Sequence, residues 1–157
     1  MSTNKTKHYQ VELTVNGVPQ TFLVTADELL VDTLREQGGY TSVKRGCDNG
    51  ECGACTVIMN KKAVPSCMVL TVEADGAEIT TVEGLAQADI LHPIQQAFLD
   101  NGAIQCGFCT PGMVLTTKAL LDENPHPTDE EIREALQNNI CRCTGYVNIL
   151  KAVKSLI

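Results

Sequence analysis

The sequence predicts an α+β protein with a strand-rich first half and a helical second half. Up to about residue 83, apolar residues alternate with polar ones between turn signals, as in half-buried strands. Beyond that point, apolar residues recur at helical spacing between helix start and stop signals. A length of 157 residues suits one ordinary domain or two small ones, and the change in pattern favours two domains, at 1–83 and 84–157.

The first half begins with a predicted hairpin and a helix. Residues 9–15 alternate between apolar and polar side chains, an Asn-Gly pair at 16–17 supplies the turn, and residues 20–24 return as a second strand. From Asp27 the apolar residues take helical spacing until a Gly-Gly pair at 38–39 ends the helix.

A glycine-rich loop and three short strands complete this half. Residues 41–55 are rich in glycine and small polar residues, which indicates a loop. Residues 56–59 and 63–67 are typical of a second hairpin, and residues 78–82 of a last short strand after an Asp-Gly turn. The order strand, strand, helix, strands is that of a β-grasp domain.

Four helices are predicted in the second half. Thr110 is expected to cap the second helix, with Pro111 at its first helical position. Thr128 and Glu131 form a capping box before the third helix. The four apolar segments lie at residues 91–99, 112–123, 132–136 and 146–153. We expect a small four-helix bundle that packs directly on the first half, because no low-complexity linker separates the two.

The composition argues against several classes of function. A net charge of −7 and a lack of Trp do not suit the binding of nucleic acid. No apolar run reaches the roughly 18 residues that a membrane span needs. The first eight residues lack the apolar region of a signal peptide, which predicts a cytoplasmic protein whose thiols bind metal. Export of a folded complex, with the signal on a partner, remains an alternative.

Eight cysteines form two groups of four, and the first group has the spacing C-x4-C-x2-C with a fourth thiol 12 positions later. This first group consists of Cys47, Cys52, Cys55 and Cys67. Its spacing is similar to that of plant-type [2Fe–2S] ferredoxins. Glycines at 46, 50 and 53 allow positive φ angles and a close approach of backbone N–H groups to the sulfurs. The alternative is a structural zinc site, although zinc sites favour C-x2-C pairs.

The second group has the spacing C-x2-C, a gap of 31 residues, then C-x-C, and consists of Cys106, Cys109, Cys141 and Cys143. The first pair leads into a helix start, whose N–H groups suit an anionic cluster. The second pair must lie on a turn, because positions i and i+2 point about 200° apart on a helix. Alone, this group also suits zinc or a redox dithiol. Together, the two groups predict two [2Fe–2S] clusters and a chain that conducts electrons.

Three motifs make the chain resemble a known family. Residues 41–57 (TSVKRGCDNGECGACTV), 105–112 (QCGFCTPG) and 139–146 (NICRCTGY) are similar to signatures of the molybdenum hydroxylases, the xanthine dehydrogenase and aldehyde oxidoreductase family. None of the eight ligand positions departs from the family pattern. The resemblance implies a small iron–sulfur subunit with a plant-type ferredoxin-like domain, followed by a helical [2Fe–2S] domain.

The resemblance also implies partners and an electron path. A large subunit would hold molybdenum on molybdopterin, and a medium subunit would hold FAD. Electrons would pass from the molybdenum through the cluster of the second group, then through that of the first, to FAD or another acceptor. In the family, the residues that match Gln105 and Cys143 lie against the pterin. The resemblance implies no catalytic residue on this chain.

Two other functions compete with this one, a structural adaptor with two zinc ions and a free-standing ferredoxin with two clusters. The three histidines, His8, His92 and His126, are far apart and near turns, so we expect them to be solvated or to cap helices. The substrate lies beyond the sequence. Purine, nicotinate, carbon monoxide, quinoline and aldehyde remain open, because the choice would be made on the molybdenum subunit.

Overall fold

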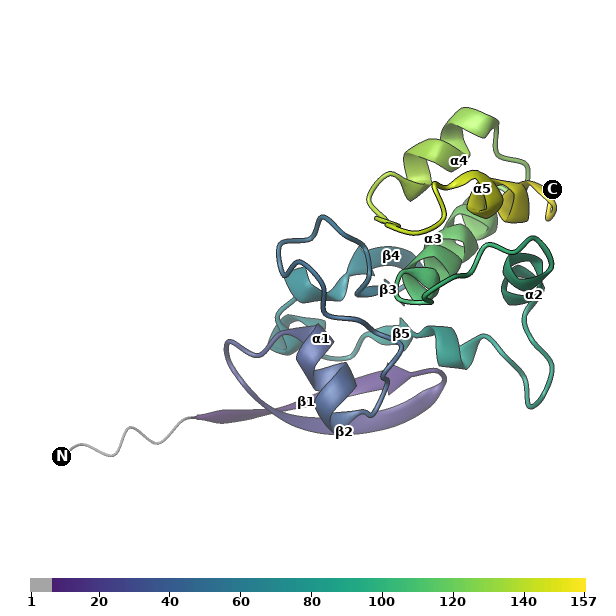
Figure 1. Ribbon diagram of the computed structural model, residues 1–157. Coiled ribbons are helices and arrows are strands. Elements are labelled where there is room, and N and C mark those ends of the chain that lie inside the picture. The colour runs from purple at the N-terminus through teal and green to yellow at the C-terminus, as the bar shows by residue number, and fades with distance from the viewer. Residues whose placement is uncertain (1–6) are drawn as a thin grey trace.

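A computed structural model of the protein describes residues 7–157, so the expected absence of a signal peptide falls partly outside the described residues. Its first half contains a mixed five-stranded sheet with the strand order β2-β1-β5-β3-β4 (Figure 1). β1 pairs with β2 antiparallel and with β5 parallel, and β3 pairs with β4 and β5 antiparallel. The strands are β1 (His8–Val15), β2 (Val18–Thr25), β3 (Thr56–Met59), β4 (Lys62–Pro65) and β5 (Glu78–Thr80).

The first hairpin confirms the sequence prediction. Asn16 and Gly17 have φ angles of 52° and 79°, and Val15 pairs with Val18. Positive φ at both turn residues is the requirement of a type I′ turn, whose twist matches that of the flanking strands. The turn therefore fixes the register, which places Val11, Leu13 and Val15 on the buried face.

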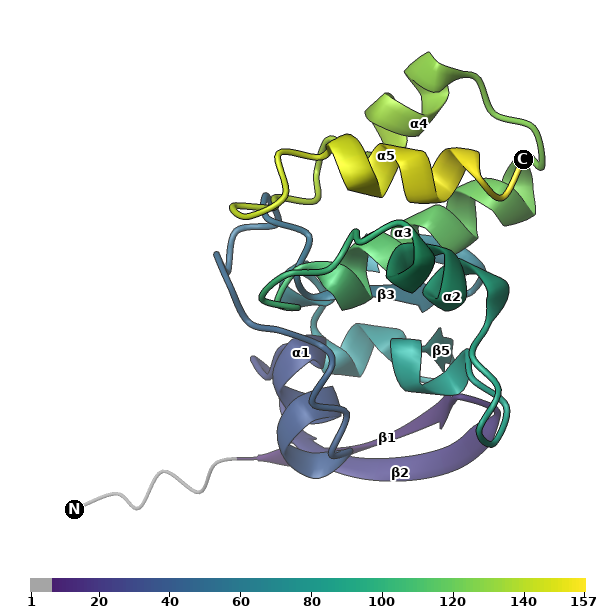
Figure 2. The same ribbon diagram turned by 45° about the vertical axis from the view of Figure 1, so that its right-hand side comes forward.

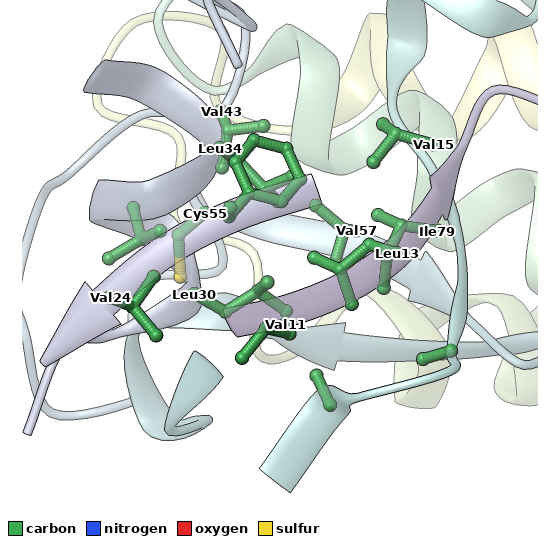
Figure 3. Packing of buried hydrophobic residues seen from close by; sticks show 14 of the residues in the cluster. Val11, Leu13, Val15, Val24, Leu30, Leu34, Val43, Cys55, Val57 and Ile79 are labelled. Atoms are coloured by element: carbon green, nitrogen blue, oxygen red, sulfur yellow. The ribbon is translucent and has the colours of Figure 1, made fainter. Parts of the chain in front are cut away.

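The predicted helix of the first half is present, but it begins later and is wound in two ways. α1 (Leu30–Asp32) is α-helical and continues as a π-helical segment, η1 (Thr33–Gln37). Leu30 and Leu34 are fully buried and point toward Val11, Val24 and Val57 of the sheet (Figure 3). This packing forms the first of two hydrophobic cores.

Two predicted strands end earlier in the structure. The strand expected at 63–67 stops at Pro65, and Ser66–Met68 form a 3₁₀ turn that buries Cys67. The strand expected at 78–82 stops at Thr80, because the Thr81 N–H donates to the side chain of Asn16 at 2.8 Å rather than to another strand. The short strands leave the connecting turns free to place side chains.

The second half contains the four expected helices, α2 (Pro93–Asp100), α3 (Thr110–Glu123), α4 (Asp129–Leu136) and α5 (Val147–Lys154). His92 caps α2 and Thr128 caps α4, each through a capping box. The predicted cap at Thr110 is wrong: Thr110 is already helical, and the N-cap position is taken by Cys109, which makes no side-chain cap bond. Within residues 7–157, no helix has the length and apolar character to cross a bilayer.

The two halves pack directly on each other, as expected. α3 lies between the β3–β4 hairpin and the other helices in both views (Figures 1 and 2). Ile58 of β3 belongs to the second hydrophobic core, together with Phe98 of α2, Met113 of α3 and Ile149 of α5. This contact holds the cysteine-rich loops of the two halves beside each other.

Candidate functional site

All eight cysteines are free thiols and lie in loops or at element ends. In the first group, Cys55 and Cys67 are buried, and Cys47 and Cys52 are half-buried. In the second group, Cys141 is buried, Cys109 is half-buried, and Cys106 and Cys143 are exposed. Each group therefore has a buried side and a more exposed side.

The loop of the first group directs backbone N–H groups at its sulfurs. Positive φ angles at Asp48, Gly50 and Gly53 fold the segment tightly. The Cys52 N–H donates to the Cys47 Sγ at 3.3 Å. Hydrogen bonds from the N–H groups of Asn49, Cys52 and Glu51 outweigh the effect of burial and lower the pKa of Cys47 to about 7. The loop thus stabilises a thiolate, the form that binds metal.

The second half of this group is drier. Burial, followed by the neighbouring Cys55 thiol, raises the pKa of Cys67 to about 11. If both neighbouring thiols lost their protons in this dry site, the two thiolates would repel each other. A cation beside them is therefore needed before both can ionise. Cys67 reaches this position through the 3₁₀ turn Ser66–Met68, not through the strand that the sequence predicted.

The second group sits at the start of α3 and in the turn before α5. The Sγ atoms of Cys143 and Cys106 are 3.5 Å apart. The Phe108 N–H is the main cause of a lowered pKa at Cys106. Burial, together with the neighbouring Cys141, raises the pKa of Cys109 to about 12. Like the first group, this one combines a wet, N–H-rich side with a dry side.

Three residues of the motif 139–146 shape the turn at 141–146. The hydroxyl of Tyr146 accepts the Cys141 N–H at 2.8 Å, and the hydroxyl of Thr144 lies 3.1 Å from the Cys141 Sγ. Gly145 and Tyr146 both have positive φ angles, 61° and 67°. The turn between two helices that C-x-C requires is therefore present, and the signal for it was the Thr-Gly-Tyr sequence directly after Cys143.

The thiols of each group are arranged two by two. After burial, the Cys47 thiol raises the pKa of Cys52, the Cys55 thiol raises that of Cys67, and the Cys141 thiol raises that of Cys109. The Sγ atoms of Cys143 and Cys106 lie 3.5 Å apart. Among residues 7–157, no three His, Cys, Asp or Glu side chains gather as ligands of a single ion. A binuclear cluster takes two thiolates on each iron and four in total, so the paired arrangement fits a [2Fe–2S] donor set.

The two cysteine groups meet at one cavity. A space of about 220 Å³ is lined by Cys52 of the first group and by all four cysteines of the second. Between the loops, the Ile140 N–H donates to the Cys52 carbonyl at 2.9 Å. The Asn139 side-chain amide donates to the Gly53 carbonyl at 3.1 Å. These contacts join residues 86 and 88 positions apart, so no local pattern predicts them.

The other residues of interest lie as follows. Gln105 is exposed, next to the exposed Cys106. Arg45 is held by the carboxylates of Asp32 and Asp48, at 2.5 and 2.9 Å. His92 accepts the Ile94 N–H in its capping box, as expected, whereas His8 and His126 are exposed.

Comparison with known proteins identifies both halves. Residues 13–86 match the family model of the 2Fe-2S iron-sulfur cluster binding domain, and residues 81–154 match that of the [2Fe-2S] binding domain. The chain is 52% identical to the nicotinate dehydrogenase small FeS subunit of Eubacterium barkeri over 92% of each chain.

Two solved structures are similar over most of this chain. Quinoline 2-oxidoreductase from Pseudomonas putida 86 superposes with a TM-score of 0.90 at 44% identity, over 93% of this chain and 90% of that one. The aldehyde oxidoreductase from Desulfovibrio gigas superposes with a TM-score of 0.89 at 46% identity, over 94% of this chain but only 17% of that one. The same unit therefore occurs both as a separate chain and as part of a much longer one.

Proposed function

Because the chain belongs to the family of small iron–sulfur subunits of molybdenum hydroxylases, we propose that it relays single electrons from a molybdopterin centre on a large partner subunit, through two [2Fe–2S] clusters, to FAD or another acceptor. The observation that carries this proposal is the grouping of eight free thiols into two sets of four, which meet at one cavity between the two halves. Under this proposal, bond chemistry takes place on the partner subunit and not on this chain.

We assign the ligands by these pairs. Cys47 and Cys52 would bind one iron of the first cluster, and Cys55 and Cys67 the other. In the second cluster, Cys106 would share an iron with Cys143, and Cys109 with Cys141. The chemistry of the donor set supports this assignment, since N–H groups aimed at the sulfurs stabilise thiolates and tune the potential of a cluster.

The order of the two clusters follows from exposure. Cys106, Cys143 and Gln105 are exposed together, so this end of the chain can meet the pterin of the large subunit. The first group reaches the same region through the contact between Cys52 and Ile140. We therefore propose that the second group receives electrons first, and that the first group delivers them to an FAD-binding medium subunit or to another acceptor.

We assign a ferredoxin-like β-grasp fold to residues 1–83 and a helical-bundle [2Fe–2S] fold to residues 84–157. The strand order supports the first assignment, and the four helices around one core support the second. The proposed boundary falls within the stretch 81–86 that the two family matches share. We place the protein in the cytoplasm, where reduced thiols are available for cluster assembly.

The substrate class follows from the relatives. The names nicotinate dehydrogenase, xanthine dehydrogenase and aldehyde oxidoreductase favour a complex that hydroxylates a heterocycle or an aldehyde. The molybdenum centre would supply that chemistry when bound to the partner. The role of this chain is to hold the thiolates, to keep the inner pairs dry, and to place the outer pair of the second group at the surface.

Anaerobic isolation of the native complex tests the proposal. We expect about four iron atoms and equal labile sulfide per chain, two kinds of paramagnetic centre on full reduction, and large molybdenum-binding chains in the same complex. Colourless protein with zinc in place of iron would contradict the proposal and support a structural adaptor. A brown chain that purifies without partners would instead support a free-standing ferredoxin.

A further inference from the structure

The two cysteine loops are joined by an interlock of two hydrogen bonds, one from the backbone of Ile140 and one from the side chain of Asn139. The interlock consists of Cys52 and Gly53 on one side and Asn139 and Ile140 on the other. Its two hydrogen bonds are those from Ile140 N–H to the Cys52 carbonyl and from the Asn139 amide to the Gly53 carbonyl. Gly53 and Asn139 are 86 positions apart in sequence.

Asn139 is built into this contact. Its exposed fraction is only 3%, and its backbone N–H donates to the Leu136 carbonyl at 2.9 Å. A Cβ added to Gly53 would lie 2.2 Å from the Asn139 Nδ2 and 2.3 Å from the Asn138 carbonyl oxygen. The fit allows no side chain at Gly53, so the amide of Asn139 fixes the position of this loop.

Each side of the interlock carries a proposed ligand of a different cluster. Cys52 directly precedes Gly53, and Cys141 directly follows Ile140. The Cys52 carbonyl and the Ile140 N–H therefore link the two sulfurs by covalent bonds and one hydrogen bond, without a gap through space. Electron tunnelling falls off far more slowly along bonds than across gaps, so a break in this hydrogen bond would remove one through-bond path between the clusters.

We propose that Asn139 is a positioning residue for electron transfer between the two clusters. Its amide holds the Gly53 carbonyl, which keeps the neighbouring Cys52 carbonyl in line with the Ile140 N–H. This inference rests on the proposed function. It assigns to Asn139 a role toward electron flow that differs from ligation, because the side chain touches neither sulfur group in its hydrogen bonding.

Two variants and one control isolate the amide. Asn139→Asp keeps the shape of the side chain but replaces the N–H donor with a second acceptor beside the Gly53 carbonyl. Asn139→Ala removes both the donor and the bulk of the side chain. Asn138→Ala removes an identical amide one residue earlier, from an exposed side chain. All three are prepared anaerobically in the full complex, and their iron and labile sulfide are measured first.

Three quantities are then measured on the samples that hold the full iron content. After pulse reduction with methyl viologen radical, electron redistribution between the clusters slows by roughly tenfold or more in both Asn139 variants, since the contact between the two loops loses one of its two hydrogen bonds. The Gly53 carbonyl keeps the N–H and the hydroxyl of Thr56 as donors, so the first loop itself stays folded. The splitting of the EPR signals of the fully reduced clusters decreases. Hydrogen exchange of the segment 137–142 accelerates by roughly tenfold to a hundredfold. Asn138→Ala matches the wild type in each readout.

The outcomes separate the two claims. Suppose that both Asn139 variants hold the full iron content and show the wild-type rates of electron redistribution and of hydrogen exchange. That result would overturn the positioning role, while the proposed function would stand. A wild-type chain without iron would overturn both. If the variants fail to fold, the exchange of the Ile140 amide in the wild type still decides: slow exchange supports the interlock, and exchange as fast as in an open loop refutes it.

Discussion

The contact between the two cysteine loops is most sharply tested by replacing Gly112 with alanine. Gly112 lies in the first turn of α3, and an added Cβ would be 2.2 Å from the Gly53 carbonyl oxygen and 3.2 Å from its carbon. The obstructing atoms belong to backbone, so no flexible side chain can move aside. The methyl group must push Gly53 away from α3, which strains the hydrogen bond from Asn139 as well.

The expected change in the free energy of unfolding is the sum of one stabilising and two destabilising contributions. Alanine in place of glycine stabilises a helix by about 1 kcal/mol. Overpacking costs about 1–3 kcal/mol. The two hydrogen bonds between the loops contribute about 0.5–1.5 kcal/mol each and are both at risk. The net loss is therefore about 1–5 kcal/mol, and the midpoint of thermal unfolding falls by at least about 2 °C for a chain of this size.

Anaerobic thermal unfolding of the iron-loaded protein, followed by circular dichroism and by visible absorbance, measures this loss. Gly39→Ala is the control, because Gly39 has a φ angle of 74° and open space around its Cβ position. It costs about 1–2 kcal/mol through backbone strain alone and leaves the cluster spectrum unchanged. A Gly112→Ala protein as stable as the wild type, or more stable, would contradict this. It would show that the gain in helix stability from alanine exceeds the cost of the steric clash, and that the loops do not interlock as described.

Three further predictions concern the clusters, the helix caps and pH. Cys109→Ser abolishes the EPR signal of the second cluster and spares that of the first, since the two donor sets are separate; loss of both signals in a folded protein contradicts the assignment. Thr128→Ala removes a cap that accepts the Glu131 N–H and costs about 1 kcal/mol in urea unfolding, against no change for His126→Ala. Burial, then the charge of Lys118, holds the pKa of His92 below its ordinary 6.5. Because the folded state binds this proton less readily than the unfolded state, the free energy of unfolding is highest above about pH 6.5 and falls as the pH drops through that value. His92→Asn keeps a capping oxygen but cannot titrate, so its unfolding midpoint should show a smaller decrease between pH 7.5 and 5.5, and an equal decrease would refute the role of His92.

Features that depend on neighbouring residues could be predicted from the sequence. The Asn-Gly turn and the capping box of Thr128 and Glu131 are local, and the structure has both where expected. The end of β4 was missed by two residues because the turn at Ser66–Met68 is stabilised from outside: Ser66 donates from both its N–H and its hydroxyl to the Cys55 carbonyl. A strand signal read from one segment does not contain that partner.

The candidate site divides in the same way. The spacing of the cysteines predicts two groups, because ligands that share a cluster must return to one place at fixed intervals, and the assignment of all eight as ligands stays a prediction. Asn139 and Gly112 belong to the motifs 139–146 and 105–112, but their contacts with Gly53 could not be predicted, since Gly53 lies in the other half of the chain. Thr110 illustrates the converse error: a hydroxyl before a proline is typical of a cap, but α3 begins at Thr110 and takes Cys109 as its N-cap residue.

The wet and dry sides of each group bear on the direction of electron flow. The exposed thiols Cys106 and Cys143 can come within reach of a partner, whereas Cys109 is half-buried and Cys141 is buried; all four line the cavity shared with Cys52. On the far side of the first group, Cys55 and Cys67 are buried in the first hydrophobic core. Those two thiols face the core, so we expect an acceptor to approach the half-buried side with Cys47. On the proposed path, electrons that enter at Cys143 and leave near Cys47 would pass the contact between Ile140 and Cys52. Glycine at 53 and 112 lets the two loops meet there, because a Cβ at either position would lie 2.2 Å from an atom of the other segment.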